Sequence, residues 1–264
     1  MNANAERRRG NVPIIPEVLN LAHEIAHELA SQGAKAVLLT GSHVRGEAYP
    51  ESDIDILVIG NGPEGKPYLL RLWRGSLVSV SWRTVDNIYE SFTIPPEVGE
   101  IIPAMRGALA LYDPDGLAAH LKRDAEAWRW DAISGRCDAW VADEITGYAE
   151  EVHRLLGNLK IGRVWVAAVQ RFVLSCRMGA IMAVHHRILY ETENRLWDLV
   201  AEAMGDHWTM VQGAAFGTGD EGFAMTCRAA LELYALAASE VKHLLDGSQY
   251  DIVAHTCVIA GHPL

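Results

Sequence analysis

Hydrophobic residues in the N-terminal part of the chain follow two different spacings. In residues 16–32, apolar side chains recur every three or four positions behind an initial proline, which predicts an amphipathic helix. Short apolar runs rich in branched side chains occupy residues 34–40, 53–60, 75–82 and 108–116, and these predict strands. The spacing therefore indicates an N-terminal domain that combines a helix with several strands.

After about residue 116 the pattern changes to helical periodicity, with no further convincing strand. The sequence predicts two domains, at residues 1–115 and 116–264, and the second consists of helices. The chain has 264 residues, which is long enough for two ordinary domains.

Composition and charge narrow the class of protein. The formal net charge of −11 disfavours a duplex nucleic acid as a partner, because binding phosphates needs a concentrated positive face. The chain contains no stretch of 18 uninterrupted apolar residues, so the sequence predicts no membrane span. The basic residues near the N-terminus are followed by no apolar core, so residues 1–13 predict a loose tail and no secretory signal. The four scattered cysteines predict free thiols in a reducing compartment, and the expected location is the cytoplasm.

One motif needs a chemical explanation. Gly41-Ser42 is followed after ten residues by Asp53-Ile54-Asp55. Side chains alternate along a strand, so the two aspartates share one face while Ile54 points into the core. Two carboxylates on one face repel each other unless a cation lies between them, and Mg²⁺ prefers such oxygen ligands. The Gly-Ser turn can offer backbone N–H groups and a hydroxyl to a phosphate. The alternative is a pair of strand-end aspartates that caps a turn.

This motif resembles the nucleotidyltransferase signature of the DNA polymerase β superfamily, a glycine-serine pair followed by an acidic-hydrophobic-acidic triplet. Arg45 and Ser52 resemble the version found in the aminoglycoside 4′-O-nucleotidyltransferases. Residues 179–192 resemble a helical segment of the same family around a His-His-Arg core, in which the two histidines, at consecutive helical positions, are expected to face different directions and to be structural.

The resemblance implies a fold and a reaction. The implied fold is α+β, with a mixed sheet flanked by helices followed by a helical bundle, often as a homodimer. The implied reaction moves AMP from ATP and Mg²⁺ to an antibiotic hydroxyl group and releases pyrophosphate. Gly41, Ser42, Arg45 and Ser52 would then bind the nucleotide, and the two aspartates would bind the metal.

The resemblance also implies a catalytic base, Glu150, with Arg154 in place of a lysine beside the nucleotide phosphates. The helical pattern of residues 140–156 places both on the polar face, opposite the apolar face. The alternative is an exposed ion pair one helical turn apart, which would stabilise the helix by only a few tenths of a kcal/mol.

One position departs from the family. A third carboxylate is expected on the next strand, where this chain has Ser79. Either two carboxylates and water hold the metal, or another acid such as Asp86 or Glu90 approaches, or the site is weakened. The sequence thus predicts a Mg²⁺-dependent enzyme that adenylylates an aminoglycoside, with no nucleic acid or membrane partner. The alternatives are another acceptor, such as a lincosamide or a protein, or an inactive binding protein of the same superfamily.

Overall fold

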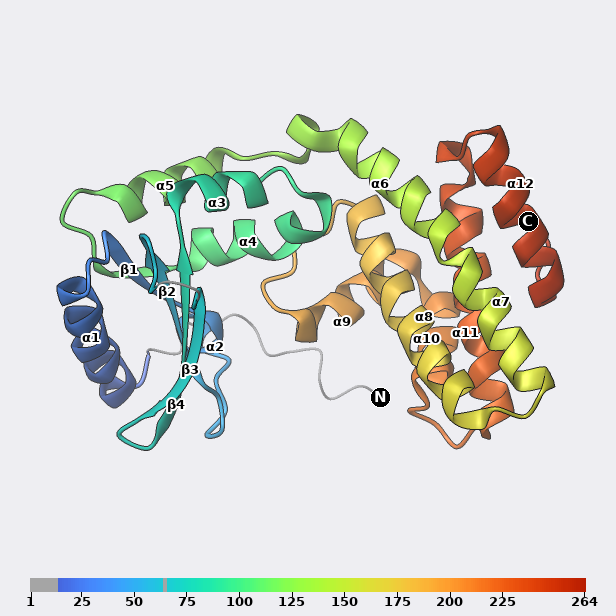
Figure 1. The fold of residues 1–264 in the computed structure, drawn as a ribbon, viewed down its shortest axis with the longest axis horizontal. Helices are drawn as coiled ribbons and strands as arrows, with labels where there is room; N and C mark the ends of the chain where they lie inside the picture. The colour runs from blue at the N-terminus through green and yellow to red at the C-terminus, as the bar shows by residue number, and fades with distance from the viewer. Residues whose placement is uncertain (1–13, 64–65) are drawn as a thin grey trace. The chain divides into compact units, whose positions relative to one another are not determined.

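The computed structural model describes residues 14–63 and 66–264 (Figure 1). The predicted tail at residues 1–13 lies outside this range. Within it, the chain forms two compact units. The first runs to Thr93 and also includes Glu100–Arg129, and the second consists of Ile94–Gly99 and Trp130–Leu264.

The first unit contains a five-stranded sheet in the order β3-β4-β2-β1-β5. The strands are β1 (Ala36–Thr40), β2 (Ile54–Ile59), β3 (Tyr68–Trp73), β4 (Ser76–Arg83) and β5 (Leu109–Tyr112). The central strand β2 is antiparallel to β1 and parallel to β4, and the outer strands are antiparallel to their neighbours. This arrangement confirms the mixed sheet.

Helix α1 (Pro16–Ser31) follows the predicted amphipathic pattern and packs on one face of the sheet. Its apolar stripe, which includes Ile25 and Leu29, contacts a cluster formed by alternate residues of the strands, such as Val37 and Val58. Leu38 points to the other face and is equally buried, while α5 (Leu117–Ala127) packs against β1. Burial on both faces explains why β2 is almost continuously apolar.

The sequence analysis missed strand β3. This strand is at the edge of the sheet and pairs only with β4 in a hairpin that turns at Arg74-Gly75. Most of its side chains are exposed although several are apolar, so it shows no alternation that would identify a strand. Pairing with its neighbour, rather than burial, defines it.

Three further helices follow β4, namely α3 (Val85–Ser91), α4 (Pro95–Gly107) and α5. Asp113, just after β5, accepts hydrogen bonds from the backbone N–H groups of Ala118 and Ala119 at the start of α5, both over 3.0 Å. These bonds tie α5 to the sheet. The first compact unit therefore extends to Arg129, whereas the change in periodicity had placed a boundary near residue 115.

The second unit is helical, as predicted. Its elements are η1 (Trp130–Ile133), α6 (Ser134–Gly147), α7 (Ala149–Lys160), α8 (Val164–His185), α9 (Glu193–Met204), α10 (Asp206–Phe216), α11 (Phe223–Val241), η2 (Lys242–Leu244) and α12 (Gly247–Ala260). The buried Tyr234 of α11 donates its hydroxyl proton to the carbonyl oxygen of Ile145 on α6, over 3.1 Å. All four cysteines are free, as expected, and three of them are buried.

Helix α8 is long and apolar enough, by length and composition alone, to cross a membrane. Half of its apolar window is buried inside the structure, where α8 packs against α6, α7 and α11. Its hydrophobicity is therefore that of a central core helix.

Candidate active site

The parts of the motif meet at one end of the three central strands. Thr40 at the end of β1 pairs with Asp55 on β2, and Asp55 pairs with Ser79 on β4. Helix α2 (Gly41–Arg45) begins directly after β1. The strand register therefore places the start of α2 beside the second aspartate of the motif.

Gly41 is required at this point for two reasons. Its φ angle is +74°, a conformation that side chains other than glycine rarely adopt. A β-carbon added here would lie 1.9 Å from Oδ2 of Asp55. The backbone of the Gly-Ser turn thus lies directly against the free oxygen of this carboxylate.

The two aspartates flank a buried residue, as predicted. Ile54 is 1% exposed, and Asp53 and Asp55 are both partly exposed. Burial raises the pKa of Asp55 above its ordinary value, and the negative charge of Asp53 adds to this increase. A hydrogen bond from Ser79 and the charges of Arg45 and His43 act in the opposite direction. The two carboxylates are therefore close enough to repel each other.

Ser79 has a clear role in this structure. Its buried hydroxyl donates a hydrogen bond to Oδ1 of Asp55 over 2.7 Å. Among the described residues, Asp53 is the only acid whose charge acts noticeably on Asp55, and neither Asp86 nor Glu90 does so. The structure therefore gives no support to the idea that another acid takes the place of the missing carboxylate.

The predicted nucleotide-binding residues lie on and after α2. The carbonyl oxygen of Ser42 accepts a hydrogen bond from the backbone N–H of Glu47, which closes the helix. Nε of Arg45 lies 2.9 Å from Oε2 of Glu47. The hydroxyl of Ser52 accepts a hydrogen bond from the backbone N–H of Tyr49 over 2.8 Å and fixes the turn before Asp53. These contacts order the segment, and its role in binding a nucleotide stays a prediction.

The sequence analysis did not single out His43. This residue is 8% exposed, its Nε2 is buried without a hydrogen-bond partner among the described residues, and its charge acts on Asp55. Its position between the Gly-Ser pair and Arg45 was the one sequence feature that could have marked His43 as part of the site. Burial of a side chain from a five-residue helix could not be read from the sequence.

This group of residues fits a hard divalent cation. It offers carboxylate oxygens from two side chains, and the pKa of one of them is raised because burial and a neighbouring carboxylate disfavour its charge. A bound cation would relieve both effects. Ser79 occupies Oδ1 of Asp55, so Oδ2 is the oxygen that remains available next to Gly41.

Glu150 and Arg154 belong to the helical unit. Both are exposed on α7, as the helical pattern predicted, while Val152 and Leu155 on the opposite face are buried. The predicted helix divides at Tyr148 between α6 and α7, but hydrogen bonding continues, because the N–H of Val152 donates to the carbonyl oxygen of Tyr148.

The guanidinium group of Arg154 binds two carboxylates. It lies 2.6 Å from an oxygen of Glu150 and 2.6 Å from an oxygen of Glu151. The side chain of Glu150 is 68% exposed, whereas that of Glu151 is 19% exposed. Of the two carboxylates, Glu150 is thus the more accessible to a substrate.

Comparisons with known proteins agree with the fold and the motif. Residues 22–94 match the family described as "Nucleotidyltransferase domain". Among solved structures, the chain is similar to a nucleotidyltransferase-like protein from Exiguobacterium sibiricum 255-15, with a TM-score of 0.53 and 11% sequence identity, over 91% of this chain and 80% of that one. No curated protein sequence matches the chain. The matched residues 22–94 contain Gly41, Ser42, Asp53 and Asp55, so the segment that carries the motif is similar to a nucleotidyltransferase domain.

Proposed function

We propose that this chain transfers AMP from ATP to the 4′ hydroxyl group of an aminoglycoside antibiotic and thereby gives resistance to it. The observation that carries the proposal is the position of Asp53 and Asp55 beside the Gly41-Ser42 turn in a nucleotidyltransferase domain. The resemblance of Arg45, Ser52 and residues 179–192 to the aminoglycoside 4′-O-nucleotidyltransferases supports the choice of acceptor.

In the proposed reaction, the acceptor oxygen forms a bond to the α-phosphorus of ATP while the bond to the β-phosphate oxygen breaks and pyrophosphate leaves. Asp53 and Asp55 would hold Mg²⁺, which neutralises the charge that develops on the phosphates. Gly41 and Ser42 would hold the triphosphate with a backbone N–H group and a hydroxyl. Arg45 would add positive charge next to it.

Glu150 would accept the proton of the attacking hydroxyl group. A general base must come within about 3 Å of the oxygen that it deprotonates. The exposure of Glu150 supports this role. Arg154 would release part of its contact with the carboxylates to bind a phosphate oxygen.

The charge of the chain supports a cationic acceptor. A net charge of −11 attracts the ammonium groups of an aminoglycoside. The free cysteines support a cytoplasmic location, where ATP is available. We also propose a homodimer, on the basis of the family resemblance.

One observation favours a second candidate, a binding protein that has lost catalysis. Ser79 stands where a third carboxylate is expected, and a hydroxyl group is a weaker metal ligand than a carboxylate. Its hydrogen bond to Asp55 instead supports a site with two carboxylates.

The decisive experiment measures AMP transfer from labelled ATP to a panel of aminoglycosides, a lincosamide and a protein acceptor, with Mg²⁺ present. The parent chain is expected to label an aminoglycoside, and Asp53→Asn is expected to lower the rate at least 100-fold, the size of effect seen when charge stabilisation in a transition state is lost. Glu51→Gln, an exposed neighbour, is the matched control and should keep the parent rate. Nucleotide binding without transfer would favour the binding protein, and transfer that survives Asp53→Asn would contradict the metal role.

A further inference from the structure

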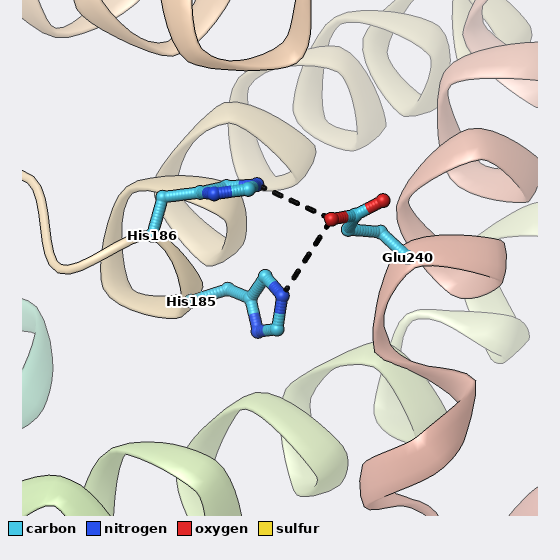
Figure 2. Close-up of side chains that lie close together, drawn as sticks. All are labelled: His185, His186 and Glu240. Atoms are coloured by element: carbon cyan, nitrogen blue, oxygen red, sulfur yellow. Dashed lines mark ion pairs between the residues drawn. The ribbon is translucent and has the colours of Figure 1, made fainter.

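Three side chains of types that can bind a metal ion converge in the helical unit. They are His185 and His186, at the end of α8, and Glu240, near the end of α11 (Figure 2). Their ligand atoms all lie within 4.8 Å of one another. Oε1 of Glu240 is 4.0 Å from Nε2 of His185 and 3.8 Å from Nε2 of His186.

The end of the helix explains how two consecutive histidines can face one carboxylate. His185 is the last residue of α8 and His186 is its C-cap. The chain then turns sharply at Arg187, which has a φ angle of +56°. Both imidazole rings lie toward α11, 4.9 Å apart between centroids and nearly perpendicular. The expectation that these side chains face different directions was wrong, because both approach the same carboxylate of Glu240.

Ordinary hydrogen bonding does not account for this group. Distances of 3.8–4.0 Å are too long for hydrogen bonds. Nδ1 of His185 is buried and has no hydrogen-bond partner among the described residues. Nε2 of His186 lies 3.1 Å from Sδ of Met204, which is a weak hydrogen-bond acceptor. By contrast, the exposed His207 and the partly exposed Glu232 make a direct contact of 3.1 Å.

The distances between the ligand atoms of these three side chains are close to those between the nitrogen and oxygen ligands of a small metal ion. Zinc bonds of about 2.0–2.2 Å in a tetrahedron place neighbouring ligand atoms about 3.4 Å apart. Small rotations of the rings and the carboxylate would therefore bring the observed distances to this value. Two imidazoles and one carboxylate suit zinc better than Mg²⁺, which prefers oxygen alone.

We propose that His185, His186 and Glu240 form a binding site for one Zn²⁺ ion, which links the end of α8 to α11. Water or a small ligand would fill the fourth position. The guanidinium group of the nearby Arg187 pairs with Asp138 at 2.5 Å, so part of its positive charge is offset.

The site can be tested on the full-length chain, free of any histidine tag and with excess Mg²⁺ to occupy carboxylate sites elsewhere. Calorimetric titration with Zn²⁺ measures affinity and stoichiometry, and Co²⁺ in place of Zn²⁺ reports ligand geometry by its visible absorption. We expect one ion per chain, tetrahedral Co²⁺ bands, and a melting temperature that rises with Zn²⁺.

The variants Glu240→Gln and His186→Gln should each weaken Zn²⁺ binding at least tenfold and abolish the Zn²⁺-dependent rise in melting temperature. His207→Gln removes one member of a histidine–glutamate pair without a third ligand, so it should bind Zn²⁺ as the parent does. Circular dichroism checks folding, and if His186→Gln does not fold, the half-exposed Glu240 decides the question. Equal binding by the parent and Glu240→Gln, or no binding by the parent, would overturn the proposal.

Discussion

The hydroxyl group of Ser79 on β4 donates a 2.7 Å hydrogen bond to Oδ1 of Asp55 on the neighbouring strand β2. This bond favours the ionised carboxylate and lowers its pKa, against the larger effect of burial. It also fixes the carboxylate with its second oxygen next to Gly41. Ser79 thus orients Asp55, although it cannot supply the charge of a third carboxylate.

Replacing Ser79 with alanine should impair the site without removing a proposed metal ligand. Outer hydrogen-bond partners of metal ligands typically contribute about 10–100-fold to metal affinity or activity, and we expect an increase of this size in the Mg²⁺ concentration for half-maximal AMP transfer. Excess Mg²⁺ should largely restore the rate. Ser81→Ala, two residues along the same strand, is the control and should leave the Mg²⁺ requirement unchanged. An unchanged requirement in Ser79→Ala would mean that the hydrogen bond has no such role.

Gly41→Ala should disrupt the site by two effects that a control can separate. The added β-carbon would collide with Asp55, and the backbone would be strained at its positive φ angle, which by itself costs about 1–2 kcal/mol. Gly33 has a φ angle of +94° but open space around its α-carbon, so Gly33→Ala introduces strain alone. We expect similar losses of thermal stability from strain in both variants, but loss of AMP transfer only in Gly41→Ala. Equal activity in both would show that the close approach is unimportant.

The local parts of the fold and of the motif could be predicted because they depend on residues close together in sequence. The periodicity of α1, the apolar run of β2 and the alternation that places Asp53 and Asp55 around Ile54 are examples. Strand β3 could not be predicted, because its apolar side chains are exposed and it is defined by pairing with β4.

Contacts between distant segments were the second limit. The bond from Ser79 to Asp55 depends on the register of two parallel strands, and the approach of Glu240 to two histidines depends on where α8 ends. Neither follows from spacing along the chain. The sequence therefore identified the residues of the motif, but it showed Ser79 only as a missing carboxylate and not as a hydrogen-bond donor to Asp55.

The raised pKa of Asp55 predicts how stability depends on pH. The folded chain binds this proton more readily than the unfolded chain, so the free energy of unfolding falls as the pH rises from the ordinary carboxyl value through the folded value. In Asp55→Asn the side chain no longer ionises, so this loss of stability with rising pH disappears. The amide oxygen can still accept the hydrogen bond from Ser79. At neutral pH without Mg²⁺, we therefore expect the variant to melt at a higher temperature than the parent.

Thermal unfolding from pH 4 to pH 8 would measure this effect, with and without Mg²⁺ and ATP. In the parent, Mg²⁺ should reduce the fall in melting temperature with rising pH, because the cation offsets the carboxylate charges. In Asp55→Asn, Mg²⁺ should change the melting temperature little. A variant that is less stable than the parent at neutral pH would show that the charge of Asp55 stabilises the fold. AMP transfer should be lost in this variant even though its stability rises.

Glu150→Gln tests the proposed base against a neighbour that makes the same contact. Both Glu150 and Glu151 lie 2.6 Å from the guanidinium group of Arg154, so replacing either removes one ion-pair partner. Only Glu150 is expected to take a proton from the acceptor hydroxyl. Loss of a general base typically lowers the rate about 10²–10⁴-fold, and we expect kcat to fall within this range in Glu150→Gln with little change in the KM for ATP. In Glu151→Gln, kcat should stay within a few-fold of the parent, and the reverse order of the two effects would assign the base to Glu151.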